Sequence, residues 1–274
     1  MLVPPTAQAY YEAALAHMRA LTQPAYVAYT AKVREEDDHV SISRDTKDGT
    51  LDISISLGRG SGTSSYSEAL RASDETTSTQ LADGTHALTH SGILNPTWWG
   101  AYRMMRDGWG AWGDPSPTPA PPAHRASPEP DDVPTIAVVK AISAGFYRIE
   151  DGGAAFCASG EPAHRVHLIA YRDPLDHPLT DAIIDTRTQE FCSLRFGLHQ
   201  SAVIGSATGE MVLDFRHVGQ YQVISDSDIS VDLHAMGFKV KHLGVNIAYS
   251  DFGFPASVPD AAFEPQVGVK ASSI

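Results

Sequence analysis

Alternation of apolar and polar residues with a period of two constrains the fold of this chain more than any other feature. The clearest segment is 51–57, where leucine and isoleucine alternate with aspartate and serine. A strand of this kind buries one face and exposes the other, which is typical of antiparallel sheets. Further strand-like segments lie at 25–34, 165–171, 182–185, 190–196, 211–216, 220–224, 229–234 and 238–249. The pattern predicts a chain rich in antiparallel strands.

Turn signals divide the first half of the chain into short strands. The dipeptides Asp48-Gly49 and Asp83-Gly84 favour tight hairpin turns. The acidic run at 35–38 predicts a turn, and the glycine- and serine-rich segment 58–65 predicts a loop. Gly244 interrupts the alternation of the last strand and predicts a β-bulge. Weaker strands are expected at 66–71 and 76–81, and further strands at 85–89, 136–142 and 146–149.

One helix is expected near the start of the chain. Thr6 suits the N-cap position, and apolar residues from Tyr10 to Leu21 recur with helical spacing. Pro24 prevents further extension. Because no alternation of strands and helices follows, we expect an α+β fold with one curved, hairpin-connected antiparallel sheet. Residues 1–274 are predicted to form a single domain with one long insertion.

The insertion holds all four tryptophans of the chain in segment 92–113. Its aromatic and sulfur-containing residues are Trp98, Trp99, Tyr102, Met104, Met105, Trp109 and Trp112. Segment 114–134 follows with eight of the 18 prolines, so it cannot continue a helix or join a sheet interior. Large rings and thioethers suit irregular apolar surfaces. Three interpretations stay open: a lid over a hollow, an amphipathic packing helix, or a surface that docks on a membrane or a protein.

The charge balance argues against some classes of partner. The chain has 20 Lys and Arg against 33 Asp and Glu, a net charge of -13. This balance disfavours nucleic acids and anionic lipid headgroups, because both bind clustered cations. No apolar stretch is long enough to span a membrane as a helix. The first residues lack the features of a secretory signal, so we expect either a cytoplasmic protein or one whose leader was removed.

Catalytic and metal-binding patterns do not stand out. His86 and His90 lie four residues apart without a third ligand at a recognisable spacing, so no metal or other cofactor is expected. Cys157 and Cys192 are compatible with one disulfide or with two buried thiols. A hydrolase site in which folding brings together a serine, a histidine and an acid stays open.

Several segments follow one another in a familiar order. They are the helix through Tyr10–Leu21, the adjoining strand 25–29, the hairpins up to residue 90, the insertion 92–112, the strands 167–171 and 182–186, and the ending 249–263. This order resembles the bacterial lipoprotein carriers of the LolA/LolB type and their relatives in envelope stress sensing. The resemblance implies an incomplete β-barrel of antiparallel strands whose mouth is covered by inserted helices.

The resemblance also implies a function. It indicates a non-enzymatic carrier or sensor of a lipid or acyl-like ligand in the periplasm, with a lipoprotein or another envelope protein as a partner. Ala170 would face the hollow of the barrel, and the implied ligand-binding residues are Val27, Tyr29, Ile53, Ile55, Leu57, Trp98, Trp99, Tyr102, Met104, Met105, Trp109, Trp112, Val166 and Leu168. The strand residues among them would equally suit a closed core. The alternatives are a hydrolase-type enzyme that uses the same hollow, and an interaction or sensor module that docks through its tryptophans.

Overall fold

The structure is a computed structural model that describes residues 6–47, 50–73, 76–80, 86–90, 96–107, 147–171, 177–202, 205–235 and 238–263. The described strands form one sheet in the order β4-β3-β2-β1-β11-β10-β9-β8-β7-β6-β5. Their bounds are β1 (Tyr26–Lys47), β2 (Thr50–Arg71), β3 (Thr76–Gln80), β4 (His86–His90), β5 (Tyr147–Phe156), β6 (Pro162–Ala170), β7 (Leu179–Asp185), β8 (Phe191–Ala202), β9 (Gly205–Val218), β10 (Tyr221–Ala235) and β11 (Phe238–Gly253). The helices are α1 (Ala7–Ala20), α2 (Trp98–Asp107) and the 3-10 helix η2 (Asp260–Phe263).

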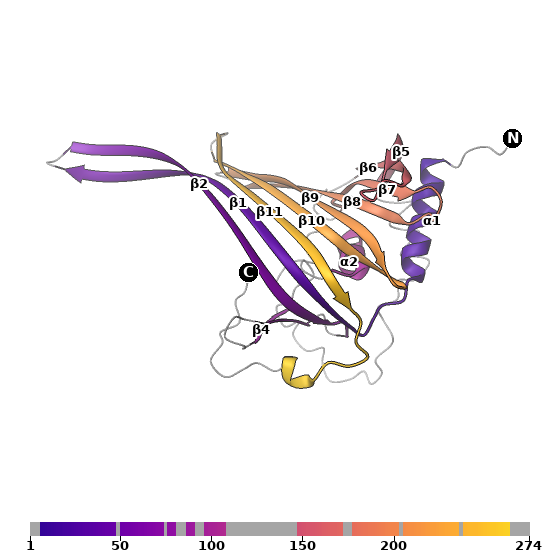
Figure 1. Ribbon diagram of the computed structural model, residues 1–274. Helices are drawn as coiled ribbons and strands as arrows, with labels where there is room; N and C mark the ends of the chain where they lie inside the picture. Colours follow the sequence, from indigo (N-terminus) through magenta and orange to yellow (C-terminus); the bar gives the residue numbers. More distant parts are fainter. Residues whose placement is uncertain are drawn as a thin grey trace, which may run out of the picture.

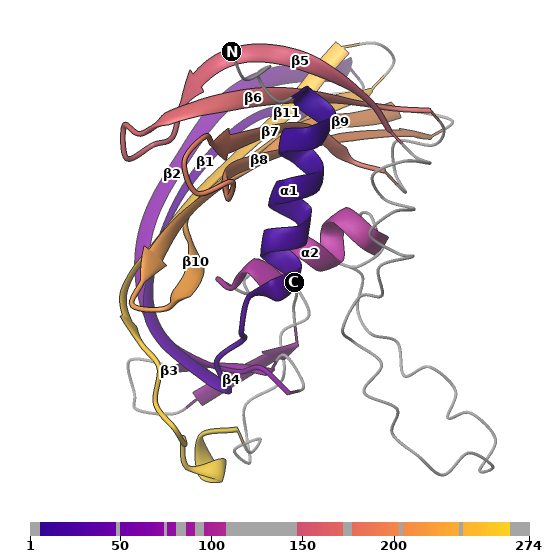
Figure 2. The same ribbon diagram turned by 90° about the vertical axis from the view of Figure 1, so that its right-hand side faces the viewer.

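The sheet is open and curved, and α1 and α2 lie on its concave side (Figures 1 and 2). All strand pairings are antiparallel, and β1 lies between β2 and β11. β4 and β5 follow each other in sequence but form opposite edges of the sheet, so the chain that contains α2 connects the two edges. This architecture confirms the predicted fold class, a curved, incomplete antiparallel barrel with an N-terminal helix and an inserted helix. The single domain over residues 1–274 stays a prediction.

Local sequence explains α1. The hydroxyl oxygen Oγ1 of Thr6 accepts a hydrogen bond from the backbone N of Ala9 at 3.2 Å, which caps the first turn. The helix ends at Ala20, before Pro24. Its buried residues recur with helical spacing and pack over β5, β6 and β7: Tyr11, Ala14, Leu15 and Met18.

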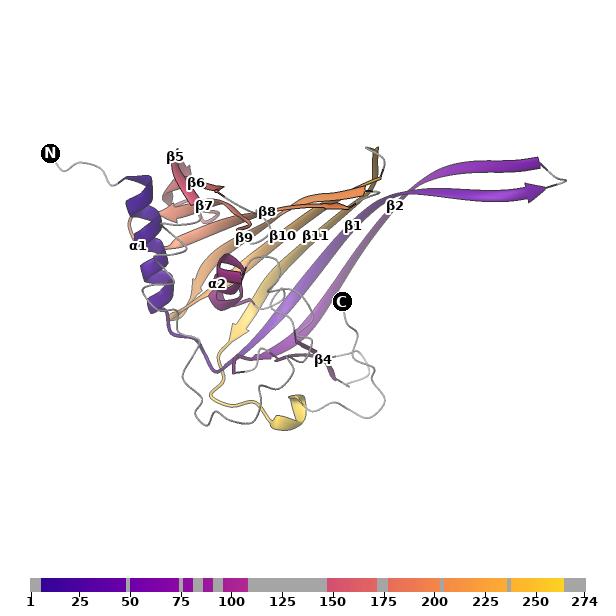
Figure 3. The same ribbon diagram turned by 180° about the vertical axis from the view of Figure 1, so that it is seen from behind.

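β1 and β2 are longer than the sequence predicts. They pair from Tyr26↔Arg71 to Lys47↔Thr50 without a register shift, so the expected turn at 35–38 and the expected loop at 58–65 are both strand. Residues 35–38 have a paired strand on either side, and these ladder hydrogen bonds outweigh the weak strand preference of acidic residues and glycine. β11 pairs with β1 only up to His39. The hairpin beyond that point extends past the rest of the sheet (Figures 1 and 3).

The predicted bulge at Gly244 is wrong. Gly244 pairs in register with Glu36 on β1 and with Ser230 on β10. The register between β10 and β11 shifts instead between Leu233 and His234. Another shift lies between β1 and β11 next to Asp251, which has a φ of 53°. Aspartate tolerates this left-handed region better than most residues, so the bend of the strand is located there.

Other strand predictions differ only in extent. Segments 220–224 and 229–234 belong to one strand, β10, which continues through a register shift between Ile224 and Asp226. The weak strand at 76–81 is β3, and the strand at 85–89 is β4. The turn at Asp83-Gly84 and the strand at 136–142 lie outside the described residues.

A disulfide joins Cys157, just after β5, to Cys192 in β8, with the two Cα atoms 5.6 Å apart. β6 and β7 lie between these two strands in the sheet. Ala163 of β6 is buried beside the cysteines, and Ile183 of β7 packs against them. The bridge therefore links non-adjacent strands and has its own small apolar cluster, separate from the main core.

Candidate functional site

The concave face is apolar over the neighbouring strands β8, β9, β10 and β11. The strand register places its side chains in rows that run across the strands. The first concave row is Leu194, Leu213, Ser227 and Ile247, the second is Phe196, Met211, Ile229 and Val245, and the third is Leu198, Gly209, Val231 and Leu243. Each row lies two residues further along its strands than the row before.

Burial decreases from the first concave row to the third. Every residue of the first row is buried. In the second row Ile229 and Val245 are half-buried, and in the third Leu198, Val231 and Leu243 are half-buried. The apolar surface therefore continues along the sheet beyond the part that is fully covered.

The start of α2 is attached to the sheet by its backbone. Thr97 forms a β-bridge with Val223, and the backbone N of Ile224 donates a hydrogen bond to the carbonyl oxygen of Pro96 at 2.7 Å. β11 begins its pairing with β10 only at Asp226, so this bridge occupies a part of β10 that β11 leaves open. The N-terminal end of α2 is thus held in place.

α2 packs as an amphipathic helix. Its buried stripe is Trp98, Ala101, Tyr102 and Met105, at i, i+3, i+4 and i+7. The Trp98 side chain is 4% exposed, which does not suit the interpretation of this residue as a docking surface. None of the helices that the structure describes combines the length and apolarity needed to cross a membrane.

Half of the residues expected to bind a ligand come together in the main apolar core. They are Val27, Tyr29, Trp98, Tyr102, Met105, Val166 and Leu168, and Ala170 packs against them. Trp99 and Met104 belong to α2, but their side chains are outside the described part, as are Trp109 and Trp112 altogether.

Ile53, Ile55 and Leu57 belong to β2, but their side chains are outside the described part. They lie opposite Arg44, Ile42 and Val40 in the hairpin beyond His39. Val27 and Tyr29 pair with Leu70 and Glu68, which are even-numbered positions of β2. Because β1 and β2 pair without a register shift, the odd-numbered positions 53, 55 and 57 of β2 have the opposite phase of the strand alternation. The ligand-binding role of Ile53, Ile55 and Leu57 stays a prediction.

Glu68 introduces a carboxyl group on the concave face of β2. Tyr29 on β1 and Thr79 on β3 are its direct cross-strand neighbours. The hydroxyl Oγ1 of Thr79 donates a hydrogen bond to Glu68 Oε1 at 2.9 Å. Burial raises the pKa of Glu68, and the hydrogen bonds from Tyr29 and Thr79 lower it in part. Burial, followed by the charge of Glu68, raises the pKa of Tyr249 on β11.

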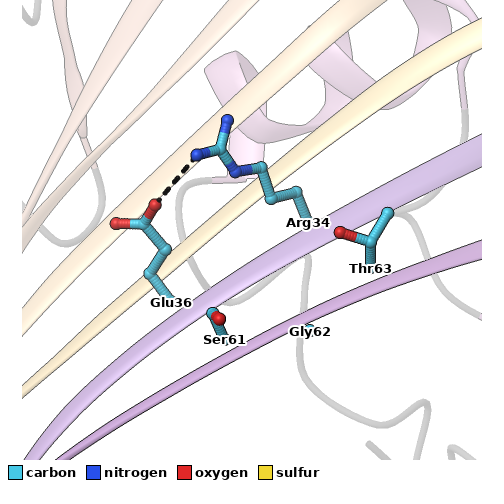
Figure 4. Close-up of a pocket in the computed structure, with 5 residues that line it drawn as sticks. All are labelled: Arg34, Glu36, Ser61, Gly62 and Thr63. Atoms are coloured by element: carbon cyan, nitrogen blue, oxygen red, sulfur yellow. Dashed lines mark hydrogen bonds and ion pairs between the residues drawn. The ribbon is translucent and has the colours of Figure 1, made fainter.

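The outer face carries polar side chains. A surface pocket of about 440 Å³ there is lined by Arg34, Glu36, Ser61, Gly62 and Thr63 (Figure 4). One guanidinium nitrogen of Arg34 lies 3.3 Å from Glu36 Oε1, and both side chains are exposed. An exposed ion pair of this kind contributes little to stability or binding. The pocket therefore offers less to a ligand than the concave face does.

Two histidine–carboxylate pairs also lie on the outer face. The Nδ1 atoms of His167 and His242 are each 2.6 Å from a carboxylate oxygen, of Asp181 and Asp232 respectively. In a hydrolase triad, the other imidazole nitrogen contacts a serine hydroxyl. Within the described ranges, no serine hydroxyl bonds to either histidine, and no three potential ligands cluster as a metal site would require.

Sequence reasoning missed Glu68 and the third concave row. One signal for Glu68 was present, since it shares a strand phase with Tyr66 and Leu70 and so puts a carboxylate in an apolar pattern. Leu198, Val231 and Leu243 come from three strands, and only the pairing register shows that they form one row.

No family model and no curated protein matches this chain. Solved structures do match it. A LolA superfamily protein from Nitrosomonas europaea is 11% identical over 96% of this chain and 99% of that chain, with a TM-score of 0.32. A domain described as outer membrane lipoprotein-sorting, from Vibrio parahaemolyticus, is 11% identical over 91% of this chain and 95% of that chain, with a TM-score of 0.32.

A third similar structure is a DUF1329 family protein from Desulfovibrio piger ATCC 29098. It is 9% identical over 95% of this chain and 98% of that chain, with a TM-score of 0.35. The resemblance to LolA superfamily proteins expected from the sequence is thus found again among solved structures. The fold itself follows from the strand pairing of this chain.

Proposed function

We propose that this protein binds a hydrophobic, lipid-like small molecule against the concave face of its sheet and carries or senses it without chemical conversion. The third concave row supports this proposal most directly. Leu198, Val231 and Leu243 continue the apolar core beyond its fully buried part, and they are half-buried. Apolar surface on a concave face is a common feature of small-molecule sites.

Burial of apolar surface would provide the affinity. A ligand that buries about 300 Å² gains roughly 7 kcal/mol at about 25 cal/mol per Å², before the cost of ordering it. The bridge between Thr97 and Val223 holds the start of α2 against the sheet. We therefore assign α2 the role of a wall of the site, with any movement confined to its far end.

We also propose an extracytoplasmic location, in the bacterial cell envelope. The disulfide between Cys157 and Cys192 supports it, because such bonds persist in oxidising compartments and are rare in reducing ones. A lipoprotein or another envelope protein is the proposed partner that delivers or receives the ligand.

Native mass spectrometry of gently purified protein, with solvent extraction of any bound lipid, tests the proposal. A fluorescent fatty acid then measures uptake by the wild type, by Val231→Gln and by the control Val212→Gln. Val231 faces the concave side and Val212 the outer side, and both are half-buried in neighbouring strands. We expect Val231→Gln to weaken uptake about tenfold, because an amide without a partner replaces apolar surface, and Val212→Gln to leave it unchanged. Protein that purifies empty and takes up no probe would contradict the proposal.

A further inference from the structure

A half-buried apolar track runs along the concave face from the third concave row to Glu68. It passes diagonally across the strands, from Leu243 and Val245 on β11 to Val33 on β1 and then to Tyr66 on β2; Val33 itself pairs with Ile247 and Ser64. The first three are half-buried, and Tyr66 is 36% exposed. Because side chains on a strand alternate between faces, Glu68 is the next residue after Tyr66 on this face. The track therefore leads from an apolar surface to the half-buried carboxyl group of Glu68. Two further carboxylates of this face, Glu35 and Asp37, lie opposite Val245 and Leu243, and Glu35 is exposed.

The Glu68 carboxyl has hydrogen-bond donors beside it. Thr79 and Tyr29 donate to it. Among the residues that the structure describes, no lysine, arginine or histidine pairs with it. Asp37 on the same face differs, since its Oδ2 lies 3.2 Å from the Nζ of Lys241. A carboxylate accepts several hydrogen bonds, so Glu68 keeps capacity for a further donor.

We propose that Glu68 binds the cationic headgroup of an amphiphile, a primary or substituted amine, whose apolar part lies along the track. This assignment rests on the proposed function and adds the chemical class of the ligand. An ammonium group supplies a positive charge and further donors in addition to those of Thr79 and Tyr29. The interaction is stronger in a half-buried site than in water. The net charge of -13 favours the same class of ligand and disfavours a carboxylate or phosphate headgroup.

Binding of an amine would be linked to the ionisation of Glu68. Burial raises the pKa of this carboxyl, which favours its neutral form in the empty protein. An ammonium ligand favours the ionised form. The affinity for the amine therefore rises as the pH increases through the pKa of Glu68, while the affinity for a neutral ligand of the same chain length does not.

Isothermal titration calorimetry with dodecylamine, dodecanol and dodecanoate separates the headgroup from the chain. The wild type should bind dodecylamine about tenfold more tightly than dodecanol, because a tenfold difference in affinity corresponds to about one charge-assisted hydrogen bond. Dodecanoate should bind most weakly. In Glu68→Gln the amine and the alcohol should bind alike. Asp37→Asn serves as the matched control, because it removes a concave carboxylate that Lys241 already neutralises, and it should keep the preference for the amine.

Each outcome of this experiment decides one point. Equal binding of the three probes by the wild type, or an amine preference that survives Glu68→Gln, overturns the headgroup assignment and leaves the proposed function intact. Failure of dodecanol and dodecylamine alike to bind overturns the proposed function itself. The pH dependence of amine binding is measured on the wild type, so it decides the assignment even if Glu68→Gln does not fold.

Discussion

Val231 on β10 lies directly opposite Gly209 on β9, and the sheet leaves no room for a side chain at Gly209. A Cβ built there would lie 2.4 Å from the carbonyl oxygen of Ser230 and 3.1 Å from Cγ2 of Val231. The carbonyl is part of the backbone and cannot rotate away. The third concave row therefore depends on a glycine at its second position.

Gly209→Ala should lower the free energy of unfolding by about 1–3 kcal/mol, because the added methyl group forces the strands apart. Gly244→Ala is the matched control in β11. The atoms nearest to its added Cβ are 3.6 Å away, which is ordinary contact, so we expect a change within about 1 kcal/mol. Urea unfolding followed by circular dichroism measures both. Equal losses for the two variants would show that the close approach at Gly209 is not what limits substitution.

Glu68 should make stability depend on pH. Burial raises its pKa in the folded protein, so its contribution is present in acid, below the ordinary pKa of a glutamate. That contribution is lost as the pH rises through the raised pKa of the folded state. Glu68→Gln cannot ionise and should lose less stability between about pH 4 and about pH 7 than the wild type. Urea unfolding at several pH values measures the free energy of unfolding of both proteins. The contributions of all other carboxyl groups are common to both and cancel in the difference. If the free energies of unfolding of the two proteins changed with pH in parallel, the raised pKa of the buried Glu68 carboxyl would be contradicted.

Removal of the disulfide should destabilise the folded state. The bond closes a loop between residues that are 35 positions apart in sequence. Replacement of Cys157 and Cys192 by alanine should lower the free energy of unfolding by about 2–4 kcal/mol, chiefly because the unfolded chain gains freedom. The same loss should appear when the wild type is unfolded in the presence of a reductant. A double variant as stable as the oxidised wild type would show that the bridge adds nothing to the fold.

Glu190 links α1 to the sheet because its carboxylate contacts one histidine on α1 and another on β9. Its Oε1 lies 2.7 Å from Nε2 of His17 on α1, and its Oε2 lies 3.0 Å from Nε2 of His217 on β9. The Glu190 side chain is 14% exposed, so its hydrogen bonds are partly shielded from water. Glu190→Ala should cost about 1–3 kcal/mol.

Glu150→Ala provides the comparison for Glu190→Ala. Glu150 pairs with Arg148 at 3.1 Å, but both side chains are about half exposed. We expect its removal to change the free energy of unfolding by less than about 1 kcal/mol. A similar cost for the two variants would argue against a special role of Glu190 in holding α1. Hydrogen exchange of the α1 amides reports on the same attachment directly.

The sequence by itself determined the features that depend on short-range periodicity. The cap at Thr6 and the spacing of apolar residues predict α1, and alternation predicts most strands and the phase of Val27, Tyr29, Val166 and Leu168. These features follow from 3.6 residues per helical turn and from two residues per strand repeat, so neighbours in sequence suffice to reveal them.

Only the tertiary structure decided the features that depend on which strands pair and in which register. The acidic run at 35–38 and the segment 58–65 are strand because neighbouring strands satisfy their backbone groups, which no local preference indicates. The same unbroken register places Ile53, Ile55 and Leu57 out of phase with Val27. The contact of Glu68 with Thr79, and the row formed by Leu198, Val231 and Leu243, exist only because several strands pair in one register. A shift by one residue would turn each of these side chains to the other face.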